Sequence, residues 1–100
     1  MSLVLPLTTT APITGQATIA VTGTAVQLPS NRLTNGFIIP AKSTNSANIT
    51  IGGSSVTNTV DGTGNGYILA AGASMSMAQH NTNLVYINGT SGDIVSFLGS

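Results

Sequence analysis

The sequence predicts an all-β fold, namely a small antiparallel β-sandwich or jelly-roll-like barrel of about eight short strands with an extended N-terminal arm. Apolar and small polar residues alternate with a period of two along much of the chain, as in residues 48–77, which is the pattern of half-buried strands. Glycine-rich corners interrupt this alternation at short intervals. Apolar residues never keep helical spacing over ten residues without a glycine or proline, so we expect no helix beyond one turn.

The N-terminal part of the chain differs from the rest. We assign residues 1–14 to an extended arm and residues 15–100 to a single β-sandwich domain, since 100 residues fit one domain. Prolines at positions 6 and 12 fix φ and remove backbone donors, which favours an extended arm or an edge strand. The arm packs on its own domain or reaches a neighbouring subunit, because exposed aliphatic side chains need cover. The candidate anchors for a partner are Leu3, Val4, Leu5, Leu7 and Ile13.

The strands of the domain follow one another at short spacing. They are predicted at residues 16–22, 24–28, 37–39, 48–51, 55–59, 67–70, 74–78, 83–88 and 93–98. Glycine or proline ends several of them, as Gly23 and Pro29 do on either side of the second. The three consecutive bulky residues 37–39 predict a strand that is covered on both faces. The strong β formers at 84–87 and the turn cluster at 88–92 predict a hairpin between the last two strands.

Ionisable side chains are scarce in this chain. The whole set consists of Arg32, Lys42, Asp61, His80 and Asp93. Charged residues make up 4% of the sequence, whereas about a quarter is typical of soluble domains. A surface of Ser, Thr, Asn and Gly gives no charge repulsion between copies. We therefore expect a protein that functions as a homo-oligomer within a larger assembly.

Several classes of partner are disfavoured by the same composition. The formal net charge is zero and no basic stripe is present, so we expect no nucleic acid partner. No apolar run approaches the ~20 residues that span a bilayer, and no basic amphipathic helix is predicted, so we expect no membrane partner. The absence of cysteine excludes a disulfide framework and a cysteine-based zinc site. The first basic residue is Arg32, so no signal peptide is predicted and we expect synthesis in a cytoplasm.

Groups able to perform catalysis are also few. A triad of His80, Asp61 or Asp93 and any serine can be drawn, but the nucleophile-elbow pattern Gly-x-Ser-x-Gly does not occur. Both aspartates sit beside turn glycines, Gly62 and Gly92, where Asp is favoured for turn geometry alone. A loop histidine would bind a metal only if several copies met, for example on the axis of a trimer. We expect no enzyme, no catalytic residue, no metal site and no cofactor.

Five segments together resemble a known class of proteins. They are AVQLPS (25–30), FIIPAK (37–42), NITIGGSSVT (48–57), GYILAAGASMSM (66–77) and NLVYINGTSGDIVSFL (83–98). Their succession of strands and glycine corners over residues 16–98 is similar to the small all-β structural proteins of tailed bacteriophage virions, in particular head decoration (cement) proteins and minor capsid domains. The resemblance implies a sandwich or jelly-roll-like module that is oligomeric on the capsid surface and carries no catalytic residues.

These expectations lead to a leading and an alternative function. The leading one is a virion protein, made in the host cytoplasm, that binds the major capsid protein as a decoration protein and stabilises the shell, with a trimer as the favoured oligomer. The alternative is a carbohydrate- or host-surface-binding module of a phage fibre or tail. Its loops at 42–47, 61–66 and 79–82 would present Asn and Ser to sugar hydroxyls. Sugar sites usually also use an exposed aromatic ring, and Tyr67 and Tyr86 are the candidates.

Overall fold

The computed structural model describes residues 12–58 and 64–100 and confirms the all-β fold. Its elements are β1 (Ile13–Thr18), β2 (Val26–Gln27), β3 (Phe37–Pro40), β4 (Ile49–Gly52), β5 (Tyr67–Leu69), β6 (Ser74–Met77), the 3₁₀ turn η2 (Thr82–Leu84), β7 (Tyr86–Asn88) and β8 (Ile94–Gly99). Within these ranges η2 is the only helical element, as the sequence predicts. No helix of the described residues is long and apolar enough to cross a membrane.

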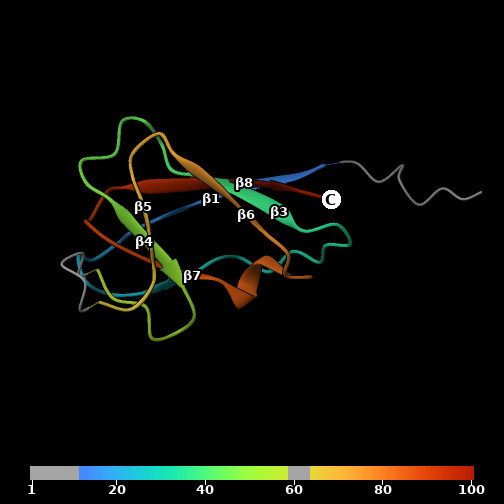
Figure 1. The fold of residues 1–100 in the computed structure, drawn as a ribbon, viewed down its shortest axis with the longest axis horizontal. Coiled ribbons are helices and arrows are strands. Elements are labelled where there is room, and N and C mark those ends of the chain that lie inside the picture. Colours follow the sequence, from blue (N-terminus) through green and yellow to red (C-terminus); the bar gives the residue numbers. More distant parts are fainter. Residues whose placement is uncertain (1–11, 59–63) are drawn as a thin grey trace, which may run out of the picture.

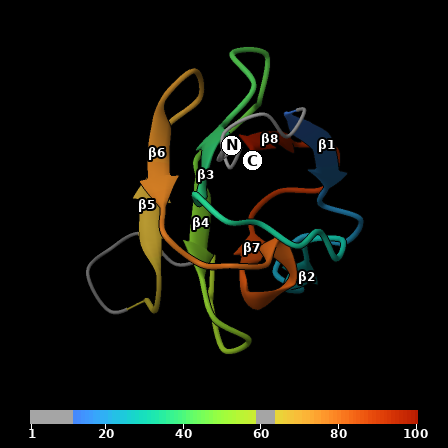
Figure 2. The same cartoon turned by 90° about the vertical axis from the view of Figure 1, so that its right-hand side faces the viewer.

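The strands form two antiparallel four-stranded sheets, which face each other as a sandwich (Figure 1). Sheet 1 has the order β1-β8-β3-β6 and sheet 2 has the order β2-β7-β4-β5. The pairs β1·β8, β2·β7, β3·β6 and β4·β5 nest inside one another along the chain and alternate between the sheets. This is the jelly-roll arrangement, a long hairpin rolled up with β4 and β5 at its tip. Figure 2 shows β1 and β2 along one side of the sandwich and β5 and β6 along the other.

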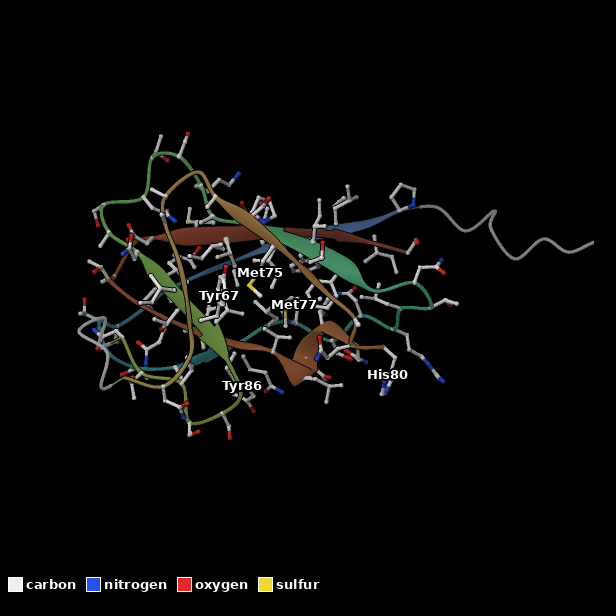
Figure 3. The ribbon with its side chains drawn as sticks, in the orientation of Figure 1. Tyr67, Met75, Met77, His80 and Tyr86 are labelled. Carbon is white, nitrogen blue, oxygen red and sulfur yellow. The ribbon has the colours of Figure 1, made fainter. Side chains whose placement is uncertain are left out.

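The core lies between the two sheets, and strand alternation explains its membership. Ile39 and Val95 of sheet 1 and Ile49 and Ile87 of sheet 2 are fully buried, each at an inward position of its strand. Phe37 and Ile39 of β3 and Val95 and Phe97 of β8 are buried at alternate positions, which is the pattern of strands with one covered face. Met75 and Met77 of β6 are half-buried and pack against this cluster, and Figure 3 shows their sulfur atoms near the middle of the molecule.

The predicted hairpin between the last two strands is wrong. β7 pairs with β2 and β4 in sheet 2, whereas β8 pairs with β1 and β3 in sheet 1. Residues 89–93 therefore cross from one sheet to the other. Asp93 fixes this crossing, because its buried carboxylate accepts hydrogen bonds from the backbone N–H groups of Ser46 (2.8 Å) and Ala47 (3.1 Å). The turn itself forms, with Asp93 N donating to Thr90 O at 3.0 Å, but it leads the chain into the other sheet and not back along β7.

The strand predicted at residues 55–59 is absent from its described part, residues 55–58. Val56 is buried there, with its side chain against Gly52 and Gly66 on the outer face of sheet 2. The backbone is held by hydrogen bonds from Val56 N to Gly53 O and from Thr57 N to Asn65 O. Because this segment covers a sheet instead of extending one, its alternating sequence reflects packing and not strand pairing.

The strand predicted at 37–39 exists as β3, but the prediction that both of its faces are covered is wrong. Phe37 and Ile39 are buried, whereas 41% of Ile38 is exposed. Successive side chains of a strand point to opposite faces, so Ile38 lies on the outer face of sheet 1. No described segment covers that position as Val56 covers sheet 2.

Candidate interaction surfaces

The outer face of sheet 1 carries an exposed apolar pair, Ile38 and Leu98. These residues stand opposite each other in the β3·β8 ladder, and they are 41% and 43% exposed. Thr14 of β1 is opposite Leu98, and Ser76 of β6 is opposite Ile38. Directly opposite residues share a face, so one row crosses all four strands with aliphatic side chains in the middle and hydroxyls at the edges.

A pocket of about 520 Å³ opens beside the apolar pair at one end of sheet 1. It lies where β1 and β3 begin and where β6 and β8 end. Its lining includes Pro12, Asn35, Ile38, Met77, Leu98 and Ser100, and none of its lining residues has an ionisable side chain. Pockets of roughly 300–1,000 Å³ commonly hold ligands, and this lining suits an uncharged, apolar one.

Hydrogen bonds and a glycine turn hold the rim of this pocket in place without a ligand. The backbone N–H groups of Thr34 and Asn35 donate to the carbonyl of Ser100, each at 2.8 Å. The Asn35 amide also donates to the Ser100 hydroxyl at 3.2 Å. Gly36 has φ +79° and lies so close to the Met77 carbonyl that a side chain would collide with it. The turn therefore needs glycine there, which fixes the β3 end of the pocket.

The outer face of sheet 2 carries a polar pair instead, Thr50 and Asn88, which also stand opposite each other. Both are almost fully buried, at 1% and 2% exposed. The Asn88 amide donates to the carbonyls of Val56 (3.0 Å) and Gly23 (3.2 Å), and its oxygen accepts from Gly89 N (2.8 Å). The Thr50 hydroxyl donates to Thr57 O. Residues 53–58 thus cover the polar pair and satisfy its hydrogen bonds.

The two tyrosines cannot form one aromatic platform for a sugar. In sheet 2, Tyr67 stands opposite Ile51 and Tyr86 stands opposite Gly52. Consecutive residues of β4 point to opposite faces, so the two rings lie on opposite faces of the sheet. Tyr67 is largely exposed at the edge of the sandwich and Tyr86 is half-buried. Figure 3 labels both side chains.

The loops of the carbohydrate alternative contribute little to a pocket. A second pocket, of about 300 Å³, borders the first of them and is lined by Ala47, Asn48, Asn58, Gly89 and Thr90. Its amides and hydroxyl could bind sugar hydroxyls, but its lining includes neither tyrosine. Residues 61–63 of the second predicted loop lie outside the described residues, and His80 of the third is exposed.

The described residues considered for catalysis are either exposed or hydrogen-bonded within the fold. His80 is exposed at the periphery of the molecule in Figure 3, and its backbone carbonyl accepts a hydrogen bond from Leu33 N at 2.7 Å. Asp93 is occupied by Ser46 and Ala47, and the Ser46 hydroxyl lies 3.0 Å from its Oδ1. Asp61 lies outside the described residues. No group of three His, Cys, Asp or Glu side chains in residues 12–58 and 64–100 could hold a metal ion.

The candidate arm anchors divide into two groups. Leu3, Val4, Leu5 and Leu7 lie outside the described residues. Ile13 is the first residue of β1, where it stands opposite Gly99 and packs, half-buried, against the core. Thr14 is also paired, with Leu98. The role of Ile13 in partner binding therefore remains a proposal, whereas its contact with the domain is observed.

The apolar pair is the feature that sequence reasoning missed. The sequence pattern predicts a strand covered on both faces around Ile38 and places Leu98 at the end of the last strand. The signal was present in residues 94–99, because Val95 and Phe97 define the inward positions and place Leu98 outward. An aliphatic residue out of phase with the alternation indicates a second, uncovered face.

Comparisons with known proteins add little to this description. No family model matches the chain, and no curated protein matches it. Among solved structures it is similar to a chain described in the words "Bacillus endospore appendages form a novel family of disulfide-linked pili". The two are 16% identical, with 100% of this chain and 98% of that chain covered and a TM-score of 0.37. A likeness at this TM-score carries no argument, and the resemblance of residues 16–98 to bacteriophage decoration proteins has no counterpart in these comparisons.

Proposed function

We propose that this protein is a structural subunit of a protein assembly and, within that class, a capsid decoration protein of a virion. The observation that carries the proposal is the exposed apolar pair of Ile38 and Leu98 beside a pocket without ionisable side chains. Jelly rolls occur in viral capsid and lectin domains, but a fold alone does not assign a function. The function therefore depends on what the surface can bind.

Association of such a surface is driven by burial. Each Å² of apolar surface removed from water contributes about 25 cal/mol before the costs of ordering. With only four charged residues in 100 and zero net charge, electrostatic repulsion between copies is weak. When copies are joined in an oligomer, their contacts with a capsid act together, so a modest contact per copy is enough to hold the oligomer on the shell. An exposed apolar surface with little charge supports a homo-oligomer as the assembled form. The trimer as the favoured oligomer and the major capsid protein as the partner, bound through another part of the surface, complete the proposal.

The test is the composition of purified particles. Mass spectrometry of virions should find this protein at a fixed copy number relative to the major capsid protein. A copy number that is a multiple of three per lattice site would support the trimer. Absence of the protein from particles, or a trace amount that varies between preparations, would contradict the proposal. A glycan array should show no binding, and glycan binding by a protein absent from particles would favour the carbohydrate alternative.

A further inference from the structure

Sheet 1 is an incomplete surface when it is compared with sheet 2. On sheet 2, residues 53–58 lie over the outer face and Val56 fills the space above Gly52 and Gly66. On sheet 1, the apolar pair and the 520 Å³ pocket have no such cover among the described residues. The missing cover must be aliphatic to match Ile38 and Leu98, and it needs no charge, because no ionisable side chain lines the pocket.

The chain itself contains a segment of this chemistry. Residues 1–11, MSLVLPLTTTA, hold four aliphatic side chains of Leu or Val and no ionisable side chain. We call these residues the arm segment. It ends at Pro12, which lines the pocket. The segment and the pocket are therefore matched in polarity and joined at one point.

The geometry of β1 favours the pocket of another copy over the pocket of the same chain. β1 runs from the pocket toward the far end of sheet 1, and Pro12, which precedes it, lines the pocket. Leu7 precedes Pro12 by five residues, which extend up to about 17 Å. To reach its own pocket, Leu7 would need a chain reversal within Thr8–Ala11. That stretch, TTTA, has no Gly, Asn or Asp for a tight turn, and its threonines favour extended backbone.

We propose that the pocket beside Ile38 and Leu98 binds the arm segment of a second copy of this chain. The contact is heterologous, arm into pocket, so each copy both gives an arm and receives one. Such contacts close into a ring or continue as an open chain. This inference rests on the proposed function, and it names the contact that joins the copies of the structural subunit.

Two full-length variants test the contact. The arm variant carries Leu3→Ser, Leu5→Ser and Leu7→Ser, and the pocket variant carries Ile38→Thr and Leu98→Thr. Sedimentation velocity should show concentration-dependent oligomers for the unaltered protein. Either variant alone should dissociate, with an association constant lower by at least about tenfold. An equimolar mixture should restore association but stop at a 1:1 dimer, because the pocket variant keeps its arm and the arm variant keeps its pocket.

A matched control separates the pocket from general surface hydrophobicity. Ile68→Thr removes an aliphatic side chain of sheet 2 that is also 43% exposed, and it should leave association unchanged. Circular dichroism of each variant establishes that it is folded. Four outcomes would overturn the proposal: a monomeric unaltered protein at every concentration, unaltered association of either variant, no dimer in the mixture, or equal loss in Ile68→Thr. A monomer whose pocket NMR signals respond to the arm substitutions would place the arm in its own pocket.

The result is independent of the test on particles. A protein that is present at fixed copy number in virions but monomeric in solution would refute the arm contact and leave the proposed function standing. A protein that associates through its arms but is absent from particles would do the opposite.

Discussion

On the outer face of sheet 2, the polar pair Thr50 and Asn88 is buried beneath residues 53–58, with its hydrogen bonds made. On the outer face of sheet 1, the apolar pair Ile38 and Leu98 is exposed. Polar residues are mostly exposed in proteins and aliphatic residues mostly buried, so both faces invert the usual order. The comparison indicates two uses for a sheet face. The covered polar pair belongs to the fold of one chain, and the exposed apolar pair is available for the contact between chains that we propose.

The largest effect is expected where the covered face loses its central amide. Asn88→Ala leaves the Val56 and Gly23 carbonyls and Gly89 N without their buried partner. The free energy of unfolding should fall by about 3 kcal/mol, since each unpaired buried group costs part of its desolvation energy. Urea denaturation measures it. The control Gln16→Ala removes an exposed amide from sheet 1 and should change stability little, so equal losses would contradict the comparison.

A smaller loss is expected when the cover itself is thinned. Val56→Ala removes two methyl groups that lie against Gly52 and Gly66, and it should lower the free energy of unfolding by about 2 kcal/mol through lost burial and a residual cavity. Val21→Ala is the matched control, because Val21 is 59% exposed. If the two variants unfold at the same urea concentration, residues 53–58 are not a stabilising cover.

Removing the hydroxyl of the polar pair should cost less. Thr50→Val keeps the shape of the side chain but leaves the Thr57 carbonyl without its donor, for an expected loss of about 1 kcal/mol. Thr14→Val makes the same change at an exposed position of sheet 1 and should be close to neutral. Thermal unfolding of the two variants, measured side by side, gives the difference directly.

The smallest effect on the monomer is expected at the apolar pair. Ile38→Thr and Leu98→Thr should each change the free energy of unfolding by no more than about 0.5 kcal/mol, because both residues are partly exposed and threonine suits a strand. The measurement needs dilute protein, since association stabilises the folded state. A loss as large as that of Val56→Ala would show that the pair belongs to the core of the single chain.

The sequence predicts the class of this fold better than its pairing. Alternation and glycine corners lead to an all-β sandwich or barrel because both are local signals, whereas the jelly roll is implied by the resemblance to virion proteins. The hairpin predicted for β7 and β8 is wrong because Asp93 is held by Ser46 and Ala47, which no local pattern reveals. Val56 alternates like a strand residue but packs over a sheet for a similarly nonlocal reason.

Only part of the candidate site can be predicted from the sequence. The aliphatic arm of residues 1–11 can be recognised in the sequence itself as an unusual apolar segment. The pocket is not, since it exists only because Pro12, Ile38 and Leu98 are brought together from three strands or their ends. Their separation along the chain leaves no local motif. The sequence does contain one signal, because Ile38 and Leu98 alternate with buried neighbours and therefore point to the outer face of the sheet.

The nested strand pairing also sets the order in which the chain can fold. Ile13 pairs with Gly99, so sheet 1 cannot be completed until Gly99 has left the ribosome. The innermost pair, β4 with β5, has the shortest loop to close and can form first. Domains dominated by such distant pairings fold in about milliseconds to seconds. During synthesis β1 therefore waits unpaired, and a sheet edge in that state is prone to pair with another nascent chain.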